Sequence, residues 1–444
     1  CFKTREEAER ALANMKKDAK APKITNFPSS GDNQTISISN SKFKQFPDYN
    51  YVKDLKDNWP ETLYTKEQLF SRILATKREN FRTDNEGNYV KIAYPLELWE
   101  EGNIPQVLSG VAGNIFGMKA VKNLRLIDIK FPTEFVKSMK GPNKGPKAFS
   151  DYLGKEGPLT SCVPKPKIGM TTDQHIQIAM DAWTGGIDCI KDDENLTNQK
   201  FNLFSERVEK LAKARDKAEN QTGDKKDAFI NVTAETKEME RRVNMIHDHG
   251  FKYFMVDVVT TGYSAVQTMV DIAHDLDMAI HAHRAMHATF TKHTTHGMNM
   301  YLLAKLMRLI GVDNLHIGTV VGKLDSPKQD VMDMVNMMLN QNIKAEGVRL
   351  LDQDFANLNP TVPTASGGLH PGTLPEVLTI YNTNQMALQV GGGIHGHPDG
   401  THYGAIATVD AIDAWKEGIT LEEKAQSSTP LKKALEQWGY IQPV

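Results

Sequence analysis

Short apolar stretches alternate with amphipathic stretches over the last two thirds of the chain. The apolar stretches are rich in Val, Ile and Ala, and this pattern is typical of strands that are buried on both faces of a parallel sheet. We predict eight such strands: Thr160–Pro166, Ile187–Asp192, Ala228–Ala234, Tyr253–Val259, Ala279–Ala285, Asn314–Val320, Thr361–Ser366 and Met386–Val390.

A helical periodicity follows each predicted strand. The expected helices are His175–Trp183, Glu206–Glu219, Glu238–His247, Ala265–Leu276, Met298–Leu309, Asp330–Leu339, Leu374–Ile380 and Ala405–Trp415. Eight strand–helix pairs in about 270 residues match the size of a (β/α)8 TIM barrel. A doubly wound sheet would need a phosphate-binding fingerprint in its first turn, and none is present. The sequence therefore predicts an α/β protein with a barrel over residues 146–444.

Residues 1–145 have a different composition and are predicted to form a smaller α+β domain. All fourteen histidines lie between His175 and His402, so this first part has none. Helices are expected around residues 5–19 and 65–79 and over Gln106–Ala120, and strands over Asn88–Tyr94 and Leu124–Phe131. Glycine and proline interrupt Gly141–Lys147, which therefore indicates a linker near the boundary.

The charge balance of the 444 residues narrows the choice of partners. Lys and Arg number 53 and Asp and Glu 55, for a net charge of −2, so we expect neither a nucleic-acid nor a membrane partner. Three cysteines without CxxC spacing indicate neither a disulfide framework nor a zinc module.

The first twenty residues suggest a charged helix without the apolar core of a signal peptide. We expect a cytoplasmic protein.

Nearly every predicted strand ends in a residue that can handle charge. In a TIM barrel the active site forms at the carboxyl ends of the strands. A purely structural barrel would not require such residues there, so the pattern favours an enzyme. In strand order they are Lys165 and Lys167; Lys191, Asp193 and Glu194; Thr233; Asp257; His281, His283 and Arg284; His316; Ser366, Gly367 and Gly368; and Gly391, Gly392 and Gly393.

The run Lys191-Asp-Asp193-Glu194 is the most informative cluster. Asp193 and Glu194 offer the hard oxygen ligands that Mg²⁺ accepts. A lysine ammonium would repel the ion, but a neutral Lys191 amine can react with CO2 to give a carbamate, which is an anionic ligand. The alternative is a solvated charge run at the start of a helix, where acids are favoured by the helix dipole.

Two glycine clusters follow the last two predicted strands, where barrels often bind phosphate with backbone N–H groups. Either cluster could instead be a tight turn. Arg284, His316 and Lys323 could neutralise a second phosphate. Lys323 stands in a glycine-flanked segment that suggests a mobile lid rather than a P-loop, because the GxxxxGK[ST] spacing is absent.

The histidine pairs His281–His283 and His395–His397 have the spacing of two ligands on one strand or turn. Zinc would require a third ligand at a recognisable spacing, and neither pair has one. We therefore do not predict a zinc site.

Several strand-end strings together resemble ribulose-1,5-bisphosphate carboxylase/oxygenase (Rubisco) large subunits. They cover the whole barrel in order: Lys165–Gly169, Gly185–Asn195, His283–His287, His316–Leu324, Ser366–Pro371 and Gln389–Gly393. The resemblance extends back to Ile92–Pro95 and Ala112–Met118. The run Lys191–Thr197 and the string Glu436–Gly439 look most similar to the archaeal form III branch.

That resemblance implies Mg²⁺-dependent carboxylation and oxygenation of ribulose 1,5-bisphosphate, with CO2 and O2 as the other substrates. Lys191 would be carbamylated by CO2 and would coordinate Mg²⁺ with Asp193 and Glu194. Lys165, His283 and Lys323 would be the other catalytic residues, His283 handling a substrate hydroxyl proton and Lys323 acting from the closing loop. The substrate-binding set would be Asn114, Lys167, Arg284, His316, Ser366, Gly367, Gly368, Gly391 and Gly392.

Asn114 would reach the site of a partner subunit, so the resemblance implies at least a homodimer, and rings of dimers occur in this branch. Residues 1–87 resemble the family poorly. The string closest to the family's Glu-Ser-Ser-x-Gly-Thr-Trp-like segment is Phe27–Thr35, which lacks its Glu and Trp.

Two other hypotheses stay open. One is a Rubisco-like protein that enolises or isomerises a related sugar phosphate, and the other is a non-catalytic subunit. By analogy with its branch, a carboxylase would act in nucleotide salvage.

Overall fold

The structure is a computed structural model that describes residues 94, 96–117, 123–321, 327–344 and 349–440. It divides into two compact units. The first unit comprises residues 1–127, 294–297 and 345–351, and the second comprises residues 128–293, 298–344 and 352–444, as far as each is described. The predicted helices at 5–19 and 65–79, all of the strand Asn88–Tyr94 except Tyr94, and Lys323 lie outside the described residues.

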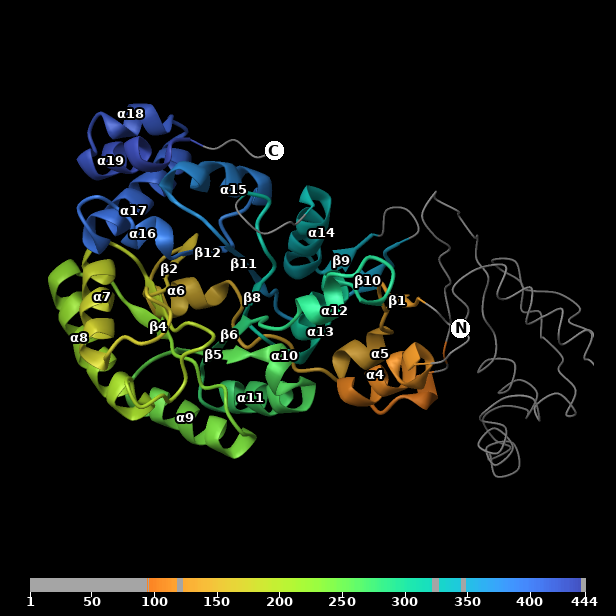
Figure 1. Ribbon diagram of the computed structural model, residues 1–444. Helices are drawn as coiled ribbons and strands as arrows, with labels where there is room; N and C mark the ends of the chain where they lie inside the picture. The colour runs from red at the N-terminus through yellow and green to blue at the C-terminus, as the bar shows by residue number, and fades with distance from the viewer. Residues whose placement is uncertain (1–93, 95, 118–122, 322–326, 345–348, 441–444) are drawn as a thin grey trace, which may run out of the picture. The chain divides into compact units, whose positions relative to one another are not determined.

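Eight parallel strands form the centre of the second unit (Figure 1). Their order in the sheet is β4 (Asp227–Phe229), β3 (Cys189–Lys191), β2 (Leu159–Cys162), β12 (Ala387–Val390), β11 (Val362–Ser366), β8 (Asn314–His316), β6 (Ala279–His283) and β5 (Tyr253–Asp257). The two outer strands meet through a parallel bridge between Asn231 and Met255. The sheet therefore closes, or nearly closes, into the predicted barrel.

A helix follows each barrel strand, as predicted. These helices are α7 (Thr172–Thr184), α8 (Phe204–Thr222), α9 (Thr236–Asp248), α11 (Tyr263–Asp275), α13 (Met300–Ile310), α14 (Lys328–Leu339), α15 (Leu374–Tyr381) and α17 (Thr401–Glu417). Local sequence fixes several ends. A capping box between Thr171 and Gln174 begins α7, and Gly223, with φ of 80°, ends α8.

The apolar core fills the amino-terminal end of the barrel. Alternate residues of each strand point inward, because successive side chains of a strand lie on opposite faces. The inward set at this level is fully buried and consists of Leu159, Cys189, Phe229, Tyr253, Met255, Ala279, Val362 and Ala387. Each large side chain of this kind contributes about 1.5–3 kcal/mol when it is fully buried.

Three buried aspartates join neighbouring strands at the same end of the barrel. Each carboxylate accepts a hydrogen bond from a backbone N–H at the start of an adjacent strand: Asp188 from Thr160, Asp227 from Lys252 and Asp313 from Ile280. Asp313 also accepts from the N–H groups of Lys144 and Gly145 in the predicted linker. These hydrogen bonds stabilise the amino-terminal end of the barrel. In TIM barrels the active site lies at the opposite, carboxyl-terminal end of the strands.

The described part of the first unit contains η2 (Leu96–Leu98), α4 (Ile104–Ala112), η3 (Asn114–Gly117) and β1 (Arg125–Leu126). Asn103 caps α4, and Pro105 occupies its first turn. The predicted helix Gln106–Ala120 was therefore wrong at both ends, since the helix starts at Ile104 and stops before Gly113.

The predicted strand Leu124–Phe131 was too long. Beyond Leu126 the backbone finds side-chain partners instead of a strand ladder. The Asp128 carboxylate accepts from Ile129 N, and the Gln353 amide bonds both the N–H and the C=O of Phe131. The predicted boundary near residue 145 stays a prediction.

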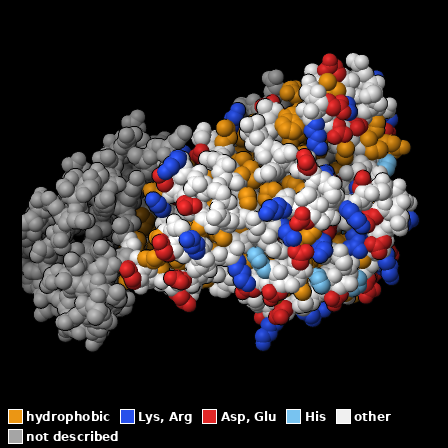
Figure 2. Space-filling view, turned by 180° about the vertical axis from the view of Figure 1, so that it is seen from behind, with side chains coloured by type: hydrophobic (Ala, Val, Ile, Leu, Met, Phe, Trp, Pro, Cys, Tyr) orange, Lys and Arg blue, Asp and Glu red, His pale blue; other side chains and the backbone are white. Residues whose placement is uncertain are grey.

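Basic and acidic side chains are interspersed over the described residues on the face that Figure 2 shows. This mixture agrees with the near-neutral net charge. Among the helices of the described residues, none is both long enough and apolar enough to cross a membrane.

Candidate active site

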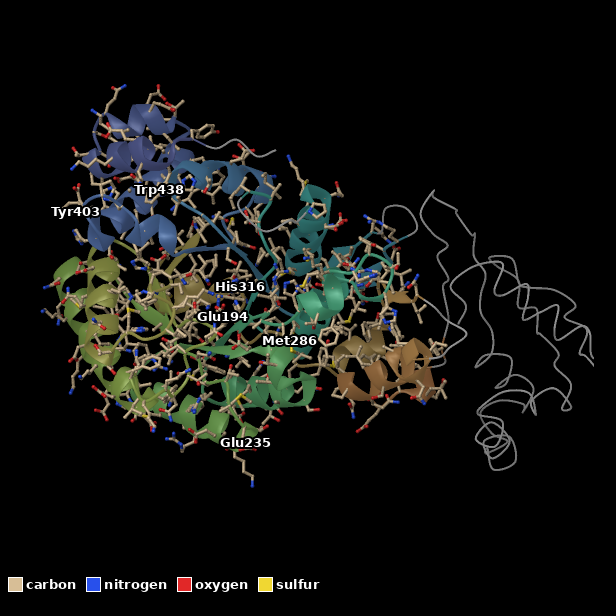
Figure 3. All side chains as sticks on the ribbon, viewed as in Figure 1. Glu194, Glu235, Met286, His316, Tyr403 and Trp438 are labelled. Atoms are coloured by element: carbon tan, nitrogen blue, oxygen red, sulfur yellow. The ribbon has the colours of Figure 1, made fainter. Side chains whose placement is uncertain are left out.

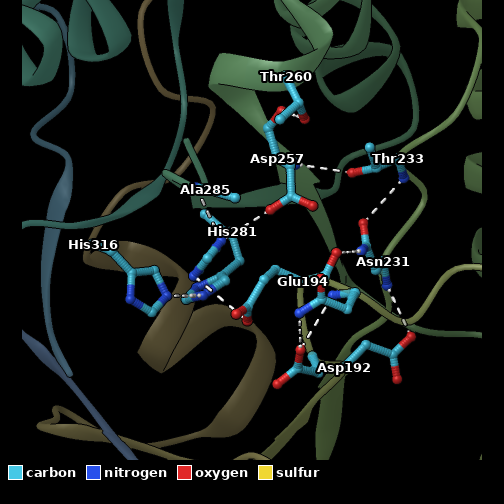
Figure 4. Close-up of polar contacts among 12 residues, drawn as sticks. Asp192, Glu194, Asn231, Thr233, Asp257, Thr260, His281, Ala285 and His316 are labelled. Carbon is cyan, nitrogen blue, oxygen red and sulfur yellow. Dashed lines mark hydrogen bonds and ion pairs between the residues drawn. The ribbon is translucent and has the colours of Figure 1, made fainter. Parts of the chain in front are cut away.

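The carboxyl ends of five barrel strands bring most of the predicted residues together. Lys191, Asp257, His283, His316 and Ser366 are the last residues of β3, β5, β6, β8 and β11, respectively. Asp193 and Glu194 follow β3 directly. Glu194 and His316 lie near the centre of the barrel unit in Figure 3, and Figure 4 shows the polar contacts around them.

Lys191 is fully buried, with no exposed side-chain surface. Its Nζ donates to the backbone oxygen of Asp192 at 2.8 Å. Burial lowers the pKa of Lys191 from its usual value, although the negative charges of Glu194 and Asp257 oppose this effect. Burial thus favours the neutral amine, which is the form that can attack CO2.

Two lysines from the β2 end face the acids. The Asp193 carboxylate lies 3.3 Å from Lys165 Nζ and 3.6 Å from Lys167 Nζ, and Glu194 Oε1 lies 2.8 Å from Lys167 Nζ. Burial alone would raise the pKa of Glu194, but opposing interactions, led by the hydrogen bond from Lys167, lower it to about 2. Glu194 is therefore ionised at neutral pH and concentrates negative charge beside Lys191.

This donor set fits Mg²⁺ on one condition. Among the described residues, no group of three or more His, Cys, Asp and Glu side chains could hold a metal ion. Asp193 and Glu194 supply two hard oxygen donors, and the buried Lys191 amine beside them would supply a third, anionic oxygen once it carries a carbamate. The site fits the ion if Lys191 is modified.

A carboxylate orients the His283 ring. Asp257 Oδ1 lies 2.9 Å from His283 Nδ1, and the backbone N–H of Asp257 is itself held by Thr233 Oγ1 at 2.9 Å (Figure 4). Burial lowers the pKa of His283, whereas the hydrogen bond with Asp257 raises it. Asp257 favours the tautomer with the hydrogen on Nδ1 and a free lone pair on Nε2, although the Ala285 N–H also points at Nδ1 at 3.2 Å, and Nε2 faces Glu194 Oε2 at 3.8 Å. Sequence analysis noted Asp257 at a strand end but gave it no role.

Arg207 braces the segment that carries the acids, and sequence analysis missed it. Its guanidinium is fully buried and donates to Asp192 Oδ2 at 3.1 Å, to Asn202 O at 3.0 Å and to Thr197 O at 2.7 Å. The backbone of residues 192–202 therefore wraps around this group. The signal was present in the sequence, because Arg207 stands in the apolar stripe of α8, between Phe204 and Leu211.

Replacing Arg207 with methionine should lower the free energy of unfolding by about 3–5 kcal/mol, because the buried Asp192 carboxylate would lose its cation. Chemical denaturation would measure the loss. Lys210→Met on the same helix removes only exposed ion pairs and should leave the free energy of unfolding nearly unchanged. Equal losses for the two variants would contradict the bracing role.

The residues predicted to bind phosphate differ in what they can offer. Arg284 is buried, and burial lowers its pKa to about 10, so it stays a cation at neutral pH. His316 uses both ring nitrogens inside the protein: Nε2 lies 2.8 Å from His281 Nε2, and Nδ1 lies 2.7 Å from Ser366 Oγ. In this arrangement Arg284 is the better anion ligand of the two.

The glycine clusters show two different requirements. Gly367 and Gly368 have φ angles of 121° and 81°, so the turn after β11 demands glycine. Gly393 is required by packing, since a Cβ there would lie 2.3 Å from Leu369 O. Gly391 lies against Lys165, and a Cβ at Gly391 would come within 3.2 Å of its Cε.

Two residues of the predicted site, Asn114 and Lys323, do not belong to the described part of the barrel unit. Asn114 begins η3 in the first unit and is exposed. Lys323 lies outside the described residues. His395 and His397 contact protein groups: His395 Nε2 lies 2.9 Å from Val163 O, and His397 Nε2 lies 2.9 Å from Pro430 O.

Comparisons with known proteins match most of the chain. The family model for the ribulose bisphosphate carboxylase large chain, catalytic domain, matches residues 147–438, and the N-terminal domain model matches residues 56–135. Ribulose bisphosphate carboxylase of Pyrococcus furiosus is 46% identical over 383 residues, which are 86% of this chain and 88% of that protein.

Two solved structures are similar in fold and sequence. The dimeric archaeal Rubisco of Hyperthermus butylicus has a TM-score of 0.79 and 42% identity, covering 83% of this chain and 86% of its own. The octameric enzyme of Pyrococcus horikoshii, solved with sulfate, has a TM-score of 0.77 and 45% identity, covering 83% and 84%.

Proposed function

Because the chain belongs to the large-chain family of ribulose bisphosphate carboxylases, in its archaeal form III branch, we propose that its barrel site carboxylates ribulose 1,5-bisphosphate. The observation that carries the proposal is the buried Lys191 at the end of β3, next to Asp193 and Glu194. Among the described residues, Lys191 Nζ has one hydrogen-bond partner, the adjacent backbone oxygen of Asp192. Carbamylation would make the buried Lys191 an anionic metal ligand.

Mg²⁺ would be held by carbamylated Lys191 together with Asp193 and Glu194. When bound, the ion supplies Lewis acidity at the C2 and C3 oxygens of the substrate. With that modification Lys191 would take the proton from C3, and the resulting enediolate would react with CO2 or O2. Lys165 serves as acid and base on the intermediates, and Lys167 supports it with positive charge. Both ammonium groups lie within 4 Å of the Asp193 carboxylate, so they are already at this reaction centre.

His283 handles a substrate hydroxyl proton at its Nε2, because its Nδ1 is engaged by Asp257. Arg284 binds one phosphate, and the predicted contribution of His316 would require it to give up one of its two ring contacts within the protein. Ser366, Gly367 and Gly368, with Gly391 and Gly392, hold the sugar and the other phosphate through the hydroxyl and backbone N–H groups. Lys323 stabilises the new carboxylate.

Asn114 acts in the site of a second subunit, so the working unit is at least a homodimer. The solved relatives described as dimeric and octameric support this assembly, and a ring of dimers is the larger alternative.

The test is fixation of labelled CO2 into 3-phosphoglycerate by the purified chain, with ribulose 1,5-bisphosphate and Mg²⁺ in the absence of oxygen. Preincubation with bicarbonate and Mg²⁺ should be required for full activity, since the amine must be carbamylated first. Isomerisation or enolisation of a sugar phosphate without labelled product would instead support the Rubisco-like alternative.

A further inference from the structure

Two buried imidazoles face each other beneath the site. His281 lies in the middle of β6, two residues before His283, and His316 ends the adjacent strand β8. Their Nε2 atoms are 2.8 Å apart, and His316 Nδ1 lies 2.7 Å from Ser366 Oγ (Figure 4 shows the His281–His316 contact). The three side chains form a hydrogen-bonded row that runs from the barrel interior to the end of β11.

The direction of the His281 ring is fixed by its neighbours. The Phe229 ring stacks on it with centroids 4.1 Å apart and an interplanar angle of 3°, and the His316 ring meets it nearly edge-on, at 82°. Both histidines are buried, His281 fully and His316 almost fully. Since the rings cannot turn without disturbing this packing, Nε2 of His281 stays aimed at His316.

A single hydrogen occupies the contact between the two rings. Two Nε2–H groups would clash at 2.8 Å, and two bare nitrogens would repel each other. Burial lowers the pKa of both histidines well below the usual value, so each ring is neutral and carries one hydrogen. Either His281 donates to His316, which then donates from Nδ1 to Ser366, or the whole row runs in reverse.

The reverse direction is disfavoured at both ends of the row. It would place a hydrogen on His281 Nδ1, which is buried and has no hydrogen-bond partner among the described residues. An unpaired buried N–H is among the rarest features of folded proteins. In the reverse direction the Ser366 hydroxyl would donate its hydrogen to His316 Nδ1. Only the lone pairs of the Ser366 oxygen would then face the anionic substrate, and they would repel it.

We propose that His281 is a positioning residue that fixes the tautomer of His316 and thereby turns the hydroxyl hydrogen of Ser366 toward the substrate. The inference rests on the proposed function for the identity of that substrate, a phosphorylated sugar whose oxygen atoms accept the bond. His281 itself is fully buried and does not touch the substrate. Its effect reaches the site through two hydrogen bonds.

Neutron diffraction from crystals of the substrate-free enzyme tests the tautomer directly. The expected map has deuterium on His281 Nε2 and His316 Nδ1, and none on His281 Nδ1. Deuterium on His281 Nδ1 and His316 Nε2 would overturn the proposal. This measurement does not depend on activity, so it stands even if ribulose bisphosphate is not the substrate.

Kinetics of three variants test the consequence. His281→Leu removes the donor, whereas His281→Gln keeps an amide N–H at the place of Nε2. We expect His281→Leu to raise KM for ribulose bisphosphate about tenfold, as for one lost hydrogen bond of about 1.4 kcal/mol, with a smaller change in kcat. His281→Gln should recover KM to within about threefold of the wild-type value, on the same scale.

The double variant separates a positioning role from a packing role. If His281 acts through Ser366, His281→Leu should change KM by less than about twofold when Ser366 is already alanine. Additive effects of the two substitutions would overturn the proposal, as would a His281→Gln enzyme no better than His281→Leu. A wild-type enzyme that fixes no CO2 would refute the proposed function and leave the neutron result to decide on His281.

Discussion

Lys191→Ala should abolish CO2 fixation, lowering kcat by at least about 10³-fold, more than the loss that follows removal of one electrostatic stabiliser in other enzymes. Without the amine no carbamate can form, so Asp193 and Glu194 would remain as a two-carboxylate set without a third anionic ligand. The base that takes the C3 proton would be lost in the same step. Assay of labelled 3-phosphoglycerate after bicarbonate activation measures the effect.

The same variant has a signature that does not need turnover. Wild-type enzyme incubated with ¹³C-labelled bicarbonate and Mg²⁺ should give a carbamate carbon resonance, and Lys191→Ala should give none. Lys165→Ala is the matched control, because it should retain the carbamate resonance while losing turnover. A carbamate resonance that survives in Lys191→Ala would refute the assignment of the modified lysine.

Asp257→Asn should lower kcat by about 10²–10⁴-fold with little change in KM, which is the usual range for losing general acid–base catalysis. The Asp257 carboxylate accepts the Nδ1 hydrogen of His283 at 2.9 Å, and an asparagine amide could donate to that nitrogen instead. The ring would then carry its hydrogen on Nε2 and could no longer take a proton from the substrate. Steady-state kinetics of CO2 fixation measures both parameters.

A combined variant shows whether Asp257 acts through the ring. In a His283→Gln background, Asp257→Asn should cause little further loss, since no tautomer remains to be set. If Asp257→Asn keeps kcat within a factor of about three of the wild-type value, proton transfer by His283 does not depend on Asp257.

The barrel could be predicted because its signal is local. Each buried strand is a short apolar run, and each is followed by a helix whose periodicity is visible in one stretch of sequence. The residues at the strand ends, such as Lys191 and His283, were then placed together by the topology of the fold. No contact between distant residues had to be known.

What sequence analysis missed depends on contacts across the chain. The position of Arg207 in the apolar stripe of α8 marks it as buried, but its partner Asp192 is known only from the contact between the two side chains. The pairing of His281 with His316 requires the distance between two rings, and the spacing of residues along a chain does not give it. The strand predicted from Leu124 failed for a similar reason, because the side chain of Gln353, far along the chain, takes the hydrogen bonds of Phe131.

The bridge that joins β4 to β5 has a consequence for how the enzyme loses activity on heating. Asn231 forms that bridge with Met255, its N–H also donates to Asp192 Oδ2, and its side-chain amide donates to Glu194 O at 3.3 Å. Two backbone hydrogen bonds hold the bridge, from Val232 N to Met255 O at 3.0 Å and from Met255 N to Ile230 O at 2.9 Å. A fluctuation that parts the barrel at this seam would therefore break the contacts of Asn231 with Asp192 and Glu194 and loosen the segment that carries the proposed metal ligands.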